Sequence, residues 1–215
     1  GVGEMMTHHD ALIFDIDGTL WNACAASAKG WNNALVKLGV EQSVTAKQIE
    51  SVAGLPFEDC IETLLPGLMN AYPHLLAALN EGELEVVEIE GGIFYEGVLD
   101  GIKLLSESHQ IFLVSNCQDW YLKLFLELSG LEPLLAGYDC NGLSGLPKYD
   151  MLTNMISKYD LKNPVYIGDT ASDEAACKQA NLDFIHVSYG FGTTVNKCLS
   201  FDSFAAFVGY FGVSL

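Results

Sequence analysis

The sequence predicts an α/β fold, with a parallel sheet as its core and an all-helical insertion after the first strand. Two observations support this prediction. Short apolar runs, typical of strands covered on both faces, alternate along the chain with segments that carry apolar residues on one helical face. Residues 21–90 depart from this alternation, because they show helical periodicity and no convincing strand. Half of the 215 residues are hydrophobic, so a packed core is expected.

Four short apolar runs are expected to form strands of the sheet. None of them alternates with polar residues, so each is predicted to be buried on both faces, as in parallel sheets. They cover residues 11–14, 111–114, 165–167 and 184–187. Between these strands, three helices are predicted from apolar residues that share a face. The three faces are Val98, Ile102 and Leu105; Leu122, Phe125 and Leu128; and Met151, Met155 and Tyr159.

The insertion is predicted to contain several helices. A long stripe of apolar residues begins at Trp21 and ends before Gly39, a residue type that commonly ends helices. Thr45 is expected to cap the next helix, and another helix is expected around residues 60–65. We predict that residues 1–20 and 91–215 form the α/β core domain and that residues 21–90 form a helical cap domain.

Charge and cysteine content restrict the possible partners. The net charge of −18 argues against nucleic acid and anionic membranes, because their phosphates select basic surfaces. The ten Lys and Arg residues are all lysines, so arginine, the usual bidentate ligand of phosphate and carboxylate, is absent. Six scattered cysteines without metal-ligand spacing, and no signal or membrane-spanning pattern, predict a cytoplasmic protein with reduced thiols. The sequence leaves the oligomeric state open.

Polar residues follow three of the predicted strands at the point where each strand ends. In an open parallel sheet, ligands bind outside the carboxyl ends of the strands. We therefore expect these residues to form one site, although they are far apart in the sequence. They are Asp15 and Asp17, Ser115 and Asn116, and Asp169 and Asp173.

The carboxylates in this set fit phosphoryl transfer through an aspartyl-phosphate. Closely spaced carboxylates suit a hard divalent cation, and we expect Mg²⁺, held by Asp15, Asp169 and a backbone carbonyl near Asp17. One aspartate would attack the phosphorus atom. The second, two residues further on, would protonate the leaving oxygen and later deprotonate the attacking water.

The remaining polar residues fit the binding of the phosphate. Gly18 has no side chain, so backbone N–H groups can approach the phosphate closely. Ser115 and Asn116 offer further hydrogen-bond donors, and Lys148 is the cation best placed in the sequence.

Four segments occur in the order of the four motifs of the haloacid dehalogenase-like (HAD) hydrolase superfamily, which the chain resembles. They are FDIDGTL at residues 14–20, LVSN at 113–116, the segment of Lys148, and IGDTASD at 167–173. Within the superfamily, the chain resembles the phosphoglycolate phosphatase and β-phosphoglucomutase branch, in which a helical cap follows the first motif. The resemblance extends from Leu12 to about Gly192, and it implies a Rossmann-like core with an inserted helical cap.

The resemblance also implies roles for individual residues. Gly54, Leu55 and Pro56 resemble a loop of the cap that reaches the site and helps to select the substrate. The other implied roles are Asp15 as nucleophile, Asp17 as general acid and base, Ser115 and Lys148 as phosphate ligands, Asp169 as Mg²⁺ ligand, and Asp173 as a support of the metal, directly or through water.

The function predicted from the sequence is a Mg²⁺-dependent phosphatase that acts on a small phosphorylated metabolite. Dehalogenation is disfavoured by the second aspartate, Asp17, which dehalogenases of the superfamily usually lack. A phosphomutase is disfavoured because its cap must hold a second phosphate and the chain has no arginine. Two alternatives stay open: a Schiff base formed by a cap lysine (Lys29, Lys37 or Lys47), and a non-catalytic protein that binds a phosphorylated ligand or a protein partner.

Overall fold

The computed structural model describes residues 8–213 and 215, and its core is a six-stranded parallel sheet in the order β5-β4-β1-β6-β7-β8. The α/β fold predicted from the sequence is thereby confirmed. The strands are β1 (Ala11–Phe14), β4 (Gln110–Ser115), β5 (Leu135–Cys140), β6 (Pro164–Gly168), β7 (Asp183–Val187) and β8 (Ser200–Phe201).

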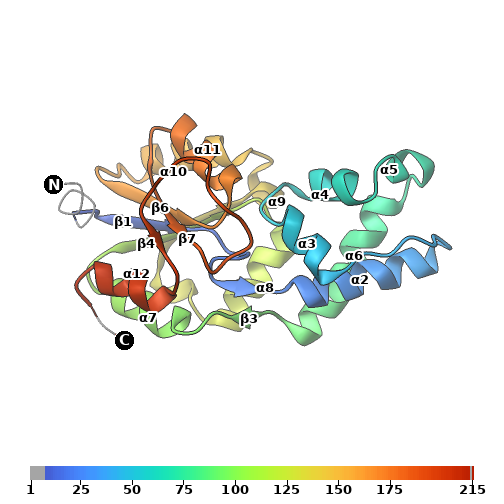
Figure 1. Ribbon diagram of the computed structural model, residues 1–215, viewed down its shortest axis with the longest axis horizontal. Coiled ribbons are helices and arrows are strands. Elements are labelled where there is room, and N and C mark those ends of the chain that lie inside the picture. The colour runs from blue at the N-terminus through green and yellow to red at the C-terminus, as the bar shows by residue number, and fades with distance from the viewer. Residues whose placement is uncertain (1–7, 214) are drawn as a thin grey trace.

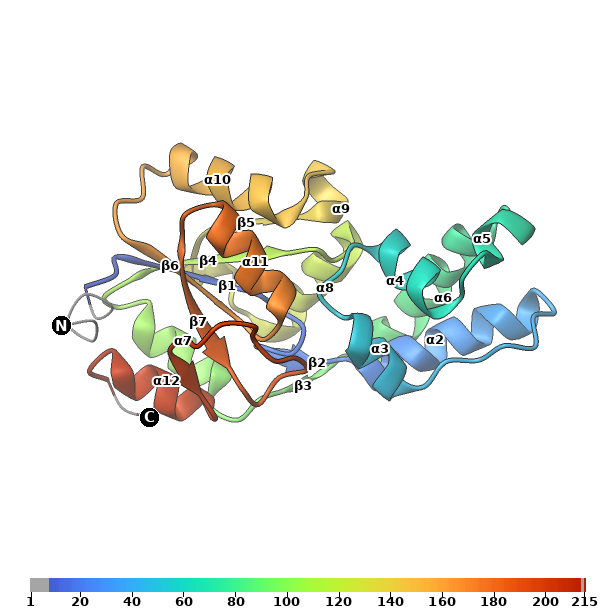
Figure 2. The ribbon, with the colours of Figure 1, turned by 45° about the horizontal axis from the view of Figure 1, so that its top comes forward.

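Helices cover both faces of this sheet, as Figure 2 shows. Successive residues of β1 point to opposite faces, so Leu12 and Phe14 pack in one hydrophobic cluster and Ala11 and Ile13 in another. The first cluster includes residues of α7 (Val98–Leu105), α8 (Asp119–Ser129) and α12 (Phe204–Tyr210), and the second includes residues of α10 (Lys148–Lys158) and α11 (Ala171–Gln179). The short helices η1 (Glu132–Leu134) and α9 (Asn141–Ser144) flank β5.

The helical insertion between β1 and β4 lies beyond one end of the sheet (Figure 1). Its apolar residues, such as Trp31, Leu35, Ile61 and Leu79, form a hydrophobic cluster of their own. It consists of α2 (Cys24–Lys37), α3 (Ala46–Val52), α4 (Phe57–Leu64), α5 (Leu68–Ala71) and α6 (Leu75–Glu90). We call α2–α6 the cap; the exact domain boundaries at residues 20/21 and 90/91 stay a prediction.

The sequence missed several strands. Trp21 was predicted to start the helical stripe of the cap, but it lies in β2 (Trp21–Asn22), which pairs with β3 (Ile93–Phe94) in an antiparallel ribbon. Its indole packs against Phe125 of α8 and donates a hydrogen bond to the hydroxyl of Tyr121, so tertiary contacts fix its conformation. The edge strand β5 was also missed, because its side chains are only partly buried and it carries Gly137 and Asp139.

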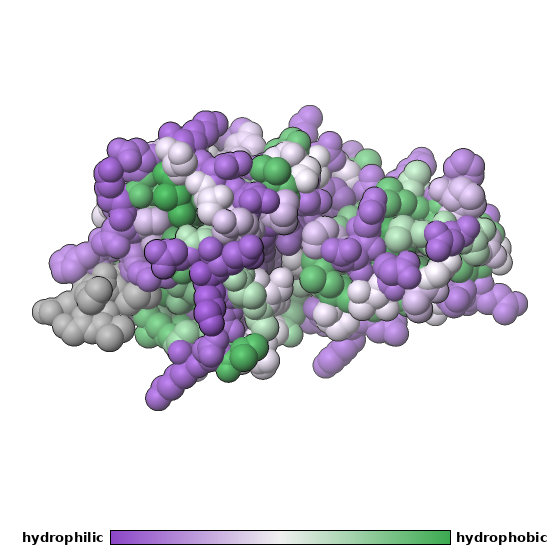
Figure 3. Space-filling view, turned by 90° about the horizontal axis from the view of Figure 1, so that it is seen from above, coloured by the Kyte–Doolittle hydropathy of each residue, from purple (hydrophilic) through white to green (hydrophobic). Residues whose placement is uncertain are grey.

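The face of the molecule seen from above in Figure 3 is mostly hydrophilic, with smaller hydrophobic areas over the core and over the cap. This agrees with the strongly acidic composition. Within the described residues, no helix has the length and apolar character needed to cross a membrane.

Two glycines bring the long cap helices α2 and α6 close together. A Cβ atom on Gly30 would lie 2.4 Å from the backbone oxygen of Gly82, and a Cβ atom on Gly82 would lie 2.4 Å from the backbone oxygen of Gly30. Neither backbone oxygen can move independently of its helix. The close approach also brings Glu83 of α6 within hydrogen-bond distance of Ser27 and Trp31 of α2.

We predict that Gly30→Ala lowers the free energy of unfolding by about 1–3 kcal/mol, because the methyl group forces α2 and α6 apart. Chemical denaturation measures this effect. Gly209→Ala is the matched control, since Gly209 is an exposed residue of α12, and a methyl group there would have no heavy atom within 4 Å outside its own helix turn. The control should stabilise the protein by about 0.5–1 kcal/mol through helix propensity. Stabilisation by both substitutions would contradict the tight helix contact.

Candidate active site

Three adjacent strands bring the predicted carboxylates together at one edge of the sheet. Strand β1 pairs with β4 on one side and with β6 on the other, all in parallel. Asp15 follows β1 directly, and Asp169 follows β6 directly. Asp173 comes from the first turn of α11, and carboxylate oxygens of the three aspartates lie within 4.8 Å of one another. All three side chains are buried.

Among the residues that the structure describes, Lys148 alone supplies a positive charge within this carboxylate cluster. It is the first residue of α10, and its Nζ lies 2.6 Å from Asp173 Oδ1 and 3.5 Å from Asp15 Oδ1. Burial disfavours the lysine charge, but the neighbouring carboxylates of Asp15 and Asp173 outweigh this and raise its pKa. Lys148 is therefore held as an ammonium group.

One ammonium group does not balance three buried carboxylates. Burial, followed by repulsion from Asp173, raises the pKa of Asp15 well above its ordinary value and that of Asp169 to about 7. Neither carboxylate oxygen of Asp15 has a hydrogen-bond partner among the described residues. Oxygen ligands and excess negative charge are what Mg²⁺ requires in proteins, so Asp15, Asp169 and Asp173 fit a Mg²⁺ site.

The backbone around the carboxylate cluster holds Asp169 and Asp173 in place. The backbone N–H of Phe191 donates to Asp169 Oδ2 at 2.8 Å, and the hydroxyl of Thr19 donates to its Oδ1 at 3.2 Å. Asp173 Oδ2 accepts hydrogen bonds from the backbone N–H groups of Asp169 and Thr170, and Thr170 caps α11 in return. The orientation of both carboxylates is thus fixed before any ligand binds.

Gly18 is required here for a reason that the sequence did not indicate. Its φ is +77°, and a Cβ atom at this position would lie 2.1 Å from Asp169 Oδ2. A side chain would therefore displace a carboxylate of the cluster. The part of Gly18 in phosphate binding stays a prediction.

The side chain of Asp17 lies apart from the carboxylate cluster. The contribution to the metal site expected from Asp17 was a backbone carbonyl near it, and its carboxylate is not among those whose oxygens converge. Instead, Asp17 Oδ1 accepts a short hydrogen bond from the hydroxyl of Tyr121, which itself accepts one from Trp21 Nε1. Burial raises the pKa of Asp17 to about 6, although the hydrogen bond from Tyr121 opposes this. Any contribution of Asp17 to the metal site would come from its backbone.

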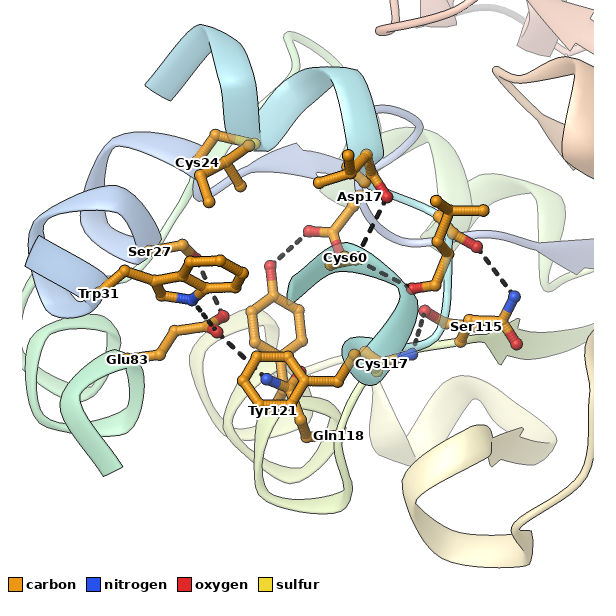
Figure 4. A pocket seen from close by; sticks show the side chains of 17 residues that line it. Asp17, Cys24, Ser27, Trp31, Cys60, Glu83, Ser115, Cys117, Gln118 and Tyr121 are labelled. Carbon is orange, nitrogen blue, oxygen red and sulfur yellow. Dashed lines mark hydrogen bonds between the residues drawn. The ribbon is translucent and has the colours of Figure 1, made fainter. Parts of the chain in front are cut away.

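Asp17 lines a cavity of about 60 Å³ between the core and the cap. Figure 4 shows side chains of both parts converging on it. Gly54 and Leu55 also line this cavity, as predicted for a substrate-selecting loop, whereas Pro56 is not among its lining residues and caps α4. The core contributes Asp17, Ser115, Asn116, Cys117, Gln118 and Tyr121; the cap contributes Cys24, Ser27, Trp31, Ile49, Val52, Ala53, Gly54, Leu55, Phe57, Cys60 and Glu83.

Hydrogen bonds hold the cap against the core. Asn116 Nδ2, which was predicted to bind phosphate, donates to the backbone oxygen of Gly54 at 2.8 Å. Trp120 Nε1 donates to Asn80 Oδ1 at 2.8 Å. The third contact joins Gln118 Nε2 to Glu83 Oε1 at 3.1 Å. The structure is therefore a closed form, in which the cap covers the carboxylate edge of the sheet.

Ser115 lies at the end of β4, within the lining of the cavity. Its hydroxyl oxygen accepts a hydrogen bond from the backbone N–H of Cys117 at 3.2 Å. The hydroxyl proton is therefore available for donation to a ligand. This geometry is compatible with the predicted contact to phosphate.

Tyr121 and Glu83 are residues of the cavity that the sequence analysis missed. Glu83 was detectable, because it shares the buried face of α6 with Leu79 and Val86, where a charged residue is unusual. Tyr121 gave no comparable signal, since an aromatic residue on a buried helix face is ordinary. Only the packing of α8 against β2 shows that its hydroxyl reaches Asp17.

Comparison with known proteins agrees with this fold. A profile of the family described as haloacid dehalogenase-like hydrolase matches residues 12–187. The chain is 28% identical over 220 aligned residues to a phosphoglycolate phosphatase of Psychrobacter arcticus, covering 93% of this chain and 94% of that protein. It is 26% identical over 192 residues to "Probable phosphatase IndB" of Dickeya dadantii, with coverages of 85% and 83%.

A solved structure shows the same fold. A haloacid dehalogenase-like hydrolase from Streptococcus pneumoniae superimposes with a TM-score of 0.79, covering 96% of this chain and all of that chain, at 18% sequence identity. At this identity the similarity extends to the fold alone.

The buried carboxylate of Glu83 generates a prediction on the pH dependence of stability. Burial raises its pKa to about 6, against 4.5 in an unfolded chain, although hydrogen bonds from Trp31 and Ser27 lower it. Between these pH values, the folded state binds the proton that the unfolded state has lost. The contribution of Glu83 is therefore present at low pH and is lost as the pH rises from about 4.5 to about 6.

We predict that Glu83→Gln gains stability relative to the wild type, by about 2 kcal/mol, as the pH rises through this window. Denaturant titrations at several pH values, compared pairwise, measure the difference. Glu85→Gln makes the same change at an exposed position of α6. Its free energy of unfolding should differ from that of the wild type by an amount that does not vary with pH. If the difference in free energy of unfolding between Glu83→Gln and the wild type also does not vary with pH, the raised pKa of Glu83 is contradicted.

Proposed function

The chain belongs to the haloacid dehalogenase-like hydrolase family, and we propose that it is a Mg²⁺-dependent phosphatase that hydrolyses a small phosphomonoester through an aspartyl-phosphate. The observation that carries this proposal is the buried cluster of Asp15, Asp169, Asp173 and Lys148 at the carboxyl edge of the sheet. It combines a carboxylate without hydrogen-bond partners among the described residues, one cation and the ligand set of a divalent metal. The name of the relative from Dickeya dadantii also supports a phosphatase.

Asp15 is the nucleophile in this proposal. One of its carboxylate oxygens attacks the phosphorus atom, and the bond between phosphorus and the leaving oxygen breaks. A water molecule then attacks the same phosphorus atom, the bond to Asp15 breaks, and inorganic phosphate leaves. Neither Asp15 oxygen accepts a hydrogen bond from a described residue, which supports this role, because no donor has to be displaced before the attack.

Asp17 is the general acid and base. It gives its proton to the leaving oxygen in the first step and takes one from the attacking water in the second. Its position in the lining of the cavity, two residues after Asp15 in the chain, supports this role. The hydroxyl of Tyr121 holds Oδ1, which leaves Oδ2 for the transferred proton.

Lys148, Ser115 and the backbone near Gly18 bind the phosphoryl group. Asp15, Asp169 and Asp173, with the backbone carbonyl near Asp17, would hold Mg²⁺, which when bound would supply positive charge against the phosphate so that a carboxylate can approach it. The closed cap keeps bulk water away from the aspartyl-phosphate. Substrate entry therefore requires the cap to open and to break its hydrogen bonds with the core.

The alternatives receive less support. All three cap lysines, Lys29, Lys37 and Lys47, are exposed, and none lines the cavity, so a Schiff base with the substrate has no suitable amine in the closed form. The same observation argues against a phosphomutase, which needs a cation in its cap for a second phosphate.

Removal of the metal tests the proposal. With p-nitrophenyl phosphate and Mg²⁺, we expect turnover that a chelator lowers by about 100-fold or more. Mg²⁺ should also raise the Tm of the metal-free protein, because an ion that binds only the folded state adds about 2.7 kcal/mol at a 100-fold excess over its Kd. Asp169→Asn should lose both effects. Equal rates with Mg²⁺ and with chelator would contradict the mechanism.

Asp15→Asn separates an enzyme from a protein that only binds a phosphorylated ligand. Turnover should fall by about 10³-fold or more, because the amide is not a nucleophile. Without metal, the free energy of unfolding should be equal to or higher than that of the wild type, because one negative charge is removed from the cluster. Lys148 retains its ion pair with Asp173, at 2.6 Å. Phosphate release and denaturant titration measure the two effects. Asp202→Asn removes an exposed carboxylate near β8 and should leave both unchanged. Retained turnover in Asp15→Asn would place the nucleophile elsewhere.

A further inference from the structure

The cavity beside Asp17 is where the leaving group of a bound phosphomonoester would lie. It borders the acid/base Asp17 and the phosphate-binding end of β4 on one side and the cap on the other. Among the described residues, the only charged ones in its lining are Asp17 and Glu83, both carboxylates. The part of the leaving group that reaches the cap therefore faces an acidic wall.

No described lysine of the cap can compensate this negative charge. Lys29 pairs with Glu90 at 2.6 Å, and Lys37 lies 4.0 Å from Glu85; both pairs are exposed on the outside of the cap. Lys47 is exposed as well. A leaving group with a carboxylate or a second phosphate would thus meet a carboxylate and no cation, which is unfavourable in a buried site.

Glu83 is a buried carboxylate that faces three hydrogen-bond donors. Only 6% of its surface is exposed, and its oxygens accept hydrogen bonds from Ser27 (3.0 Å), Trp31 (3.0 Å) and Gln118 (3.1 Å). These three donors stabilise the ionised form. A carboxylate has about four acceptor positions, so one position stays open. Within the described part of the chain, no lysine or histidine forms an ion pair with Glu83.

Aromatic rings surround the same space. Trp31, Phe57 and Tyr121 all line the cavity, and Figure 4 shows Trp31 and Tyr121 near the Glu83 carboxylate. The Trp31 and Phe57 rings meet edge to face, with centroids 5.8 Å apart. The faces of aromatic rings attract cations, most strongly in desolvated sites. A carboxylate with aromatic neighbours is a suitable environment for an ammonium group.

The size of the cavity limits the leaving group. A volume of about 60 Å³ in the closed form favours a short leaving group, such as ethanolamine, over a sugar or a nucleoside.

We propose that this cavity is a leaving-group subsite for a short amino alcohol, in which the substrate's ammonium group binds Glu83 against the rings of Trp31 and Tyr121. The inference rests on the proposed phosphatase function and names its substrate class as aminoalkyl phosphates, such as 2-aminoethyl phosphate. The ammonium group takes no part in bond making: the phosphate is transferred to Asp15 and then to water, and the free amino alcohol leaves.

Three substrates of similar size and different charge test this proposal. They are 2-aminoethyl phosphate, propyl phosphate, which is uncharged outside the phosphate, and 2-phosphoglycolate, which carries a carboxylate. With Mg²⁺ and the full-length protein, we expect kcat/KM for the amine to exceed that for propyl phosphate by about 10–100-fold, the range of a hydrogen-bonded charge in a buried site. The value for 2-phosphoglycolate should be the lowest.

Glu83→Gln should lower kcat/KM for 2-aminoethyl phosphate, mainly through KM, by about 10–100-fold more than it lowers kcat/KM for propyl phosphate. A purely structural role of Glu83 would instead affect all three substrates equally. Glu85→Gln, which removes an exposed carboxylate from the same helix, should preserve the wild-type ranking. If Glu83→Gln does not fold, the order of the three kcat/KM values measured for the wild type is sufficient to accept or reject the subsite.

A wild type that prefers 2-phosphoglycolate, or a Glu83→Gln variant with equal losses on every substrate, would overturn the subsite. Failure of the two proposals can be told apart with p-nitrophenyl phosphate. Hydrolysis of this ester and of propyl phosphate without preference for the amine rejects the subsite alone. No Mg²⁺-dependent hydrolysis of any of the four esters rejects the phosphatase function, and the subsite with it.

Discussion

The shortage of positive charge around three buried carboxylates determines how this molecule works. Asp15, Asp169 and Asp173 converge at the end of the sheet, and of the described residues Lys148 alone opposes their charge. Burying like charges is unfavourable unless a cation joins them. The fold maintains this arrangement because the aspartates follow rigid, adjacent strands or lie in the capped first turn of α11. Its residual negative charge is the physical reason for expecting a divalent metal.

The closed cap adds charged and polar groups to the site beyond the carboxylate cluster. The close contact of α2 and α6 at Gly30 and Gly82 brings Glu83 next to donors on α2, and Gln118 of the core completes its hydrogen bonds. A further buried carboxylate, Glu83, thus lines the cavity together with Asp17. In the proposed mechanism, the two ends of the site differ in charge preference: the end with Lys148 would bind the phosphate, and the end with Glu83 would bind a cation.

This difference bears on how relatives are used to infer function. The relative from Psychrobacter arcticus is named a phosphoglycolate phosphatase and matches nearly the whole chain. An identity of 28% over nearly the whole chain agrees with the shared family, but it does not make the substrate of that relative the substrate of this chain. In the proposed mechanism, the leaving group meets residues of the cap. In this chain, the described cap residues offer the cavity no cation of the kind that a carboxylate such as glycolate would need.

The sequence alone predicted the parallel α/β core, the helical insertion and the residues of the carboxylate cluster, because buried strands and polar strand ends follow from local composition and spacing. It misplaced Trp21 and missed β5, whose conformations depend on contacts with distant residues rather than on local periodicity. Tertiary structure alone decided that the Asp17 side chain turns to Tyr121, away from the cluster, and that Glu83 reaches the cavity. Such contacts join residues far apart in the chain, and the distance between them is set by helix packing, which no local pattern encodes.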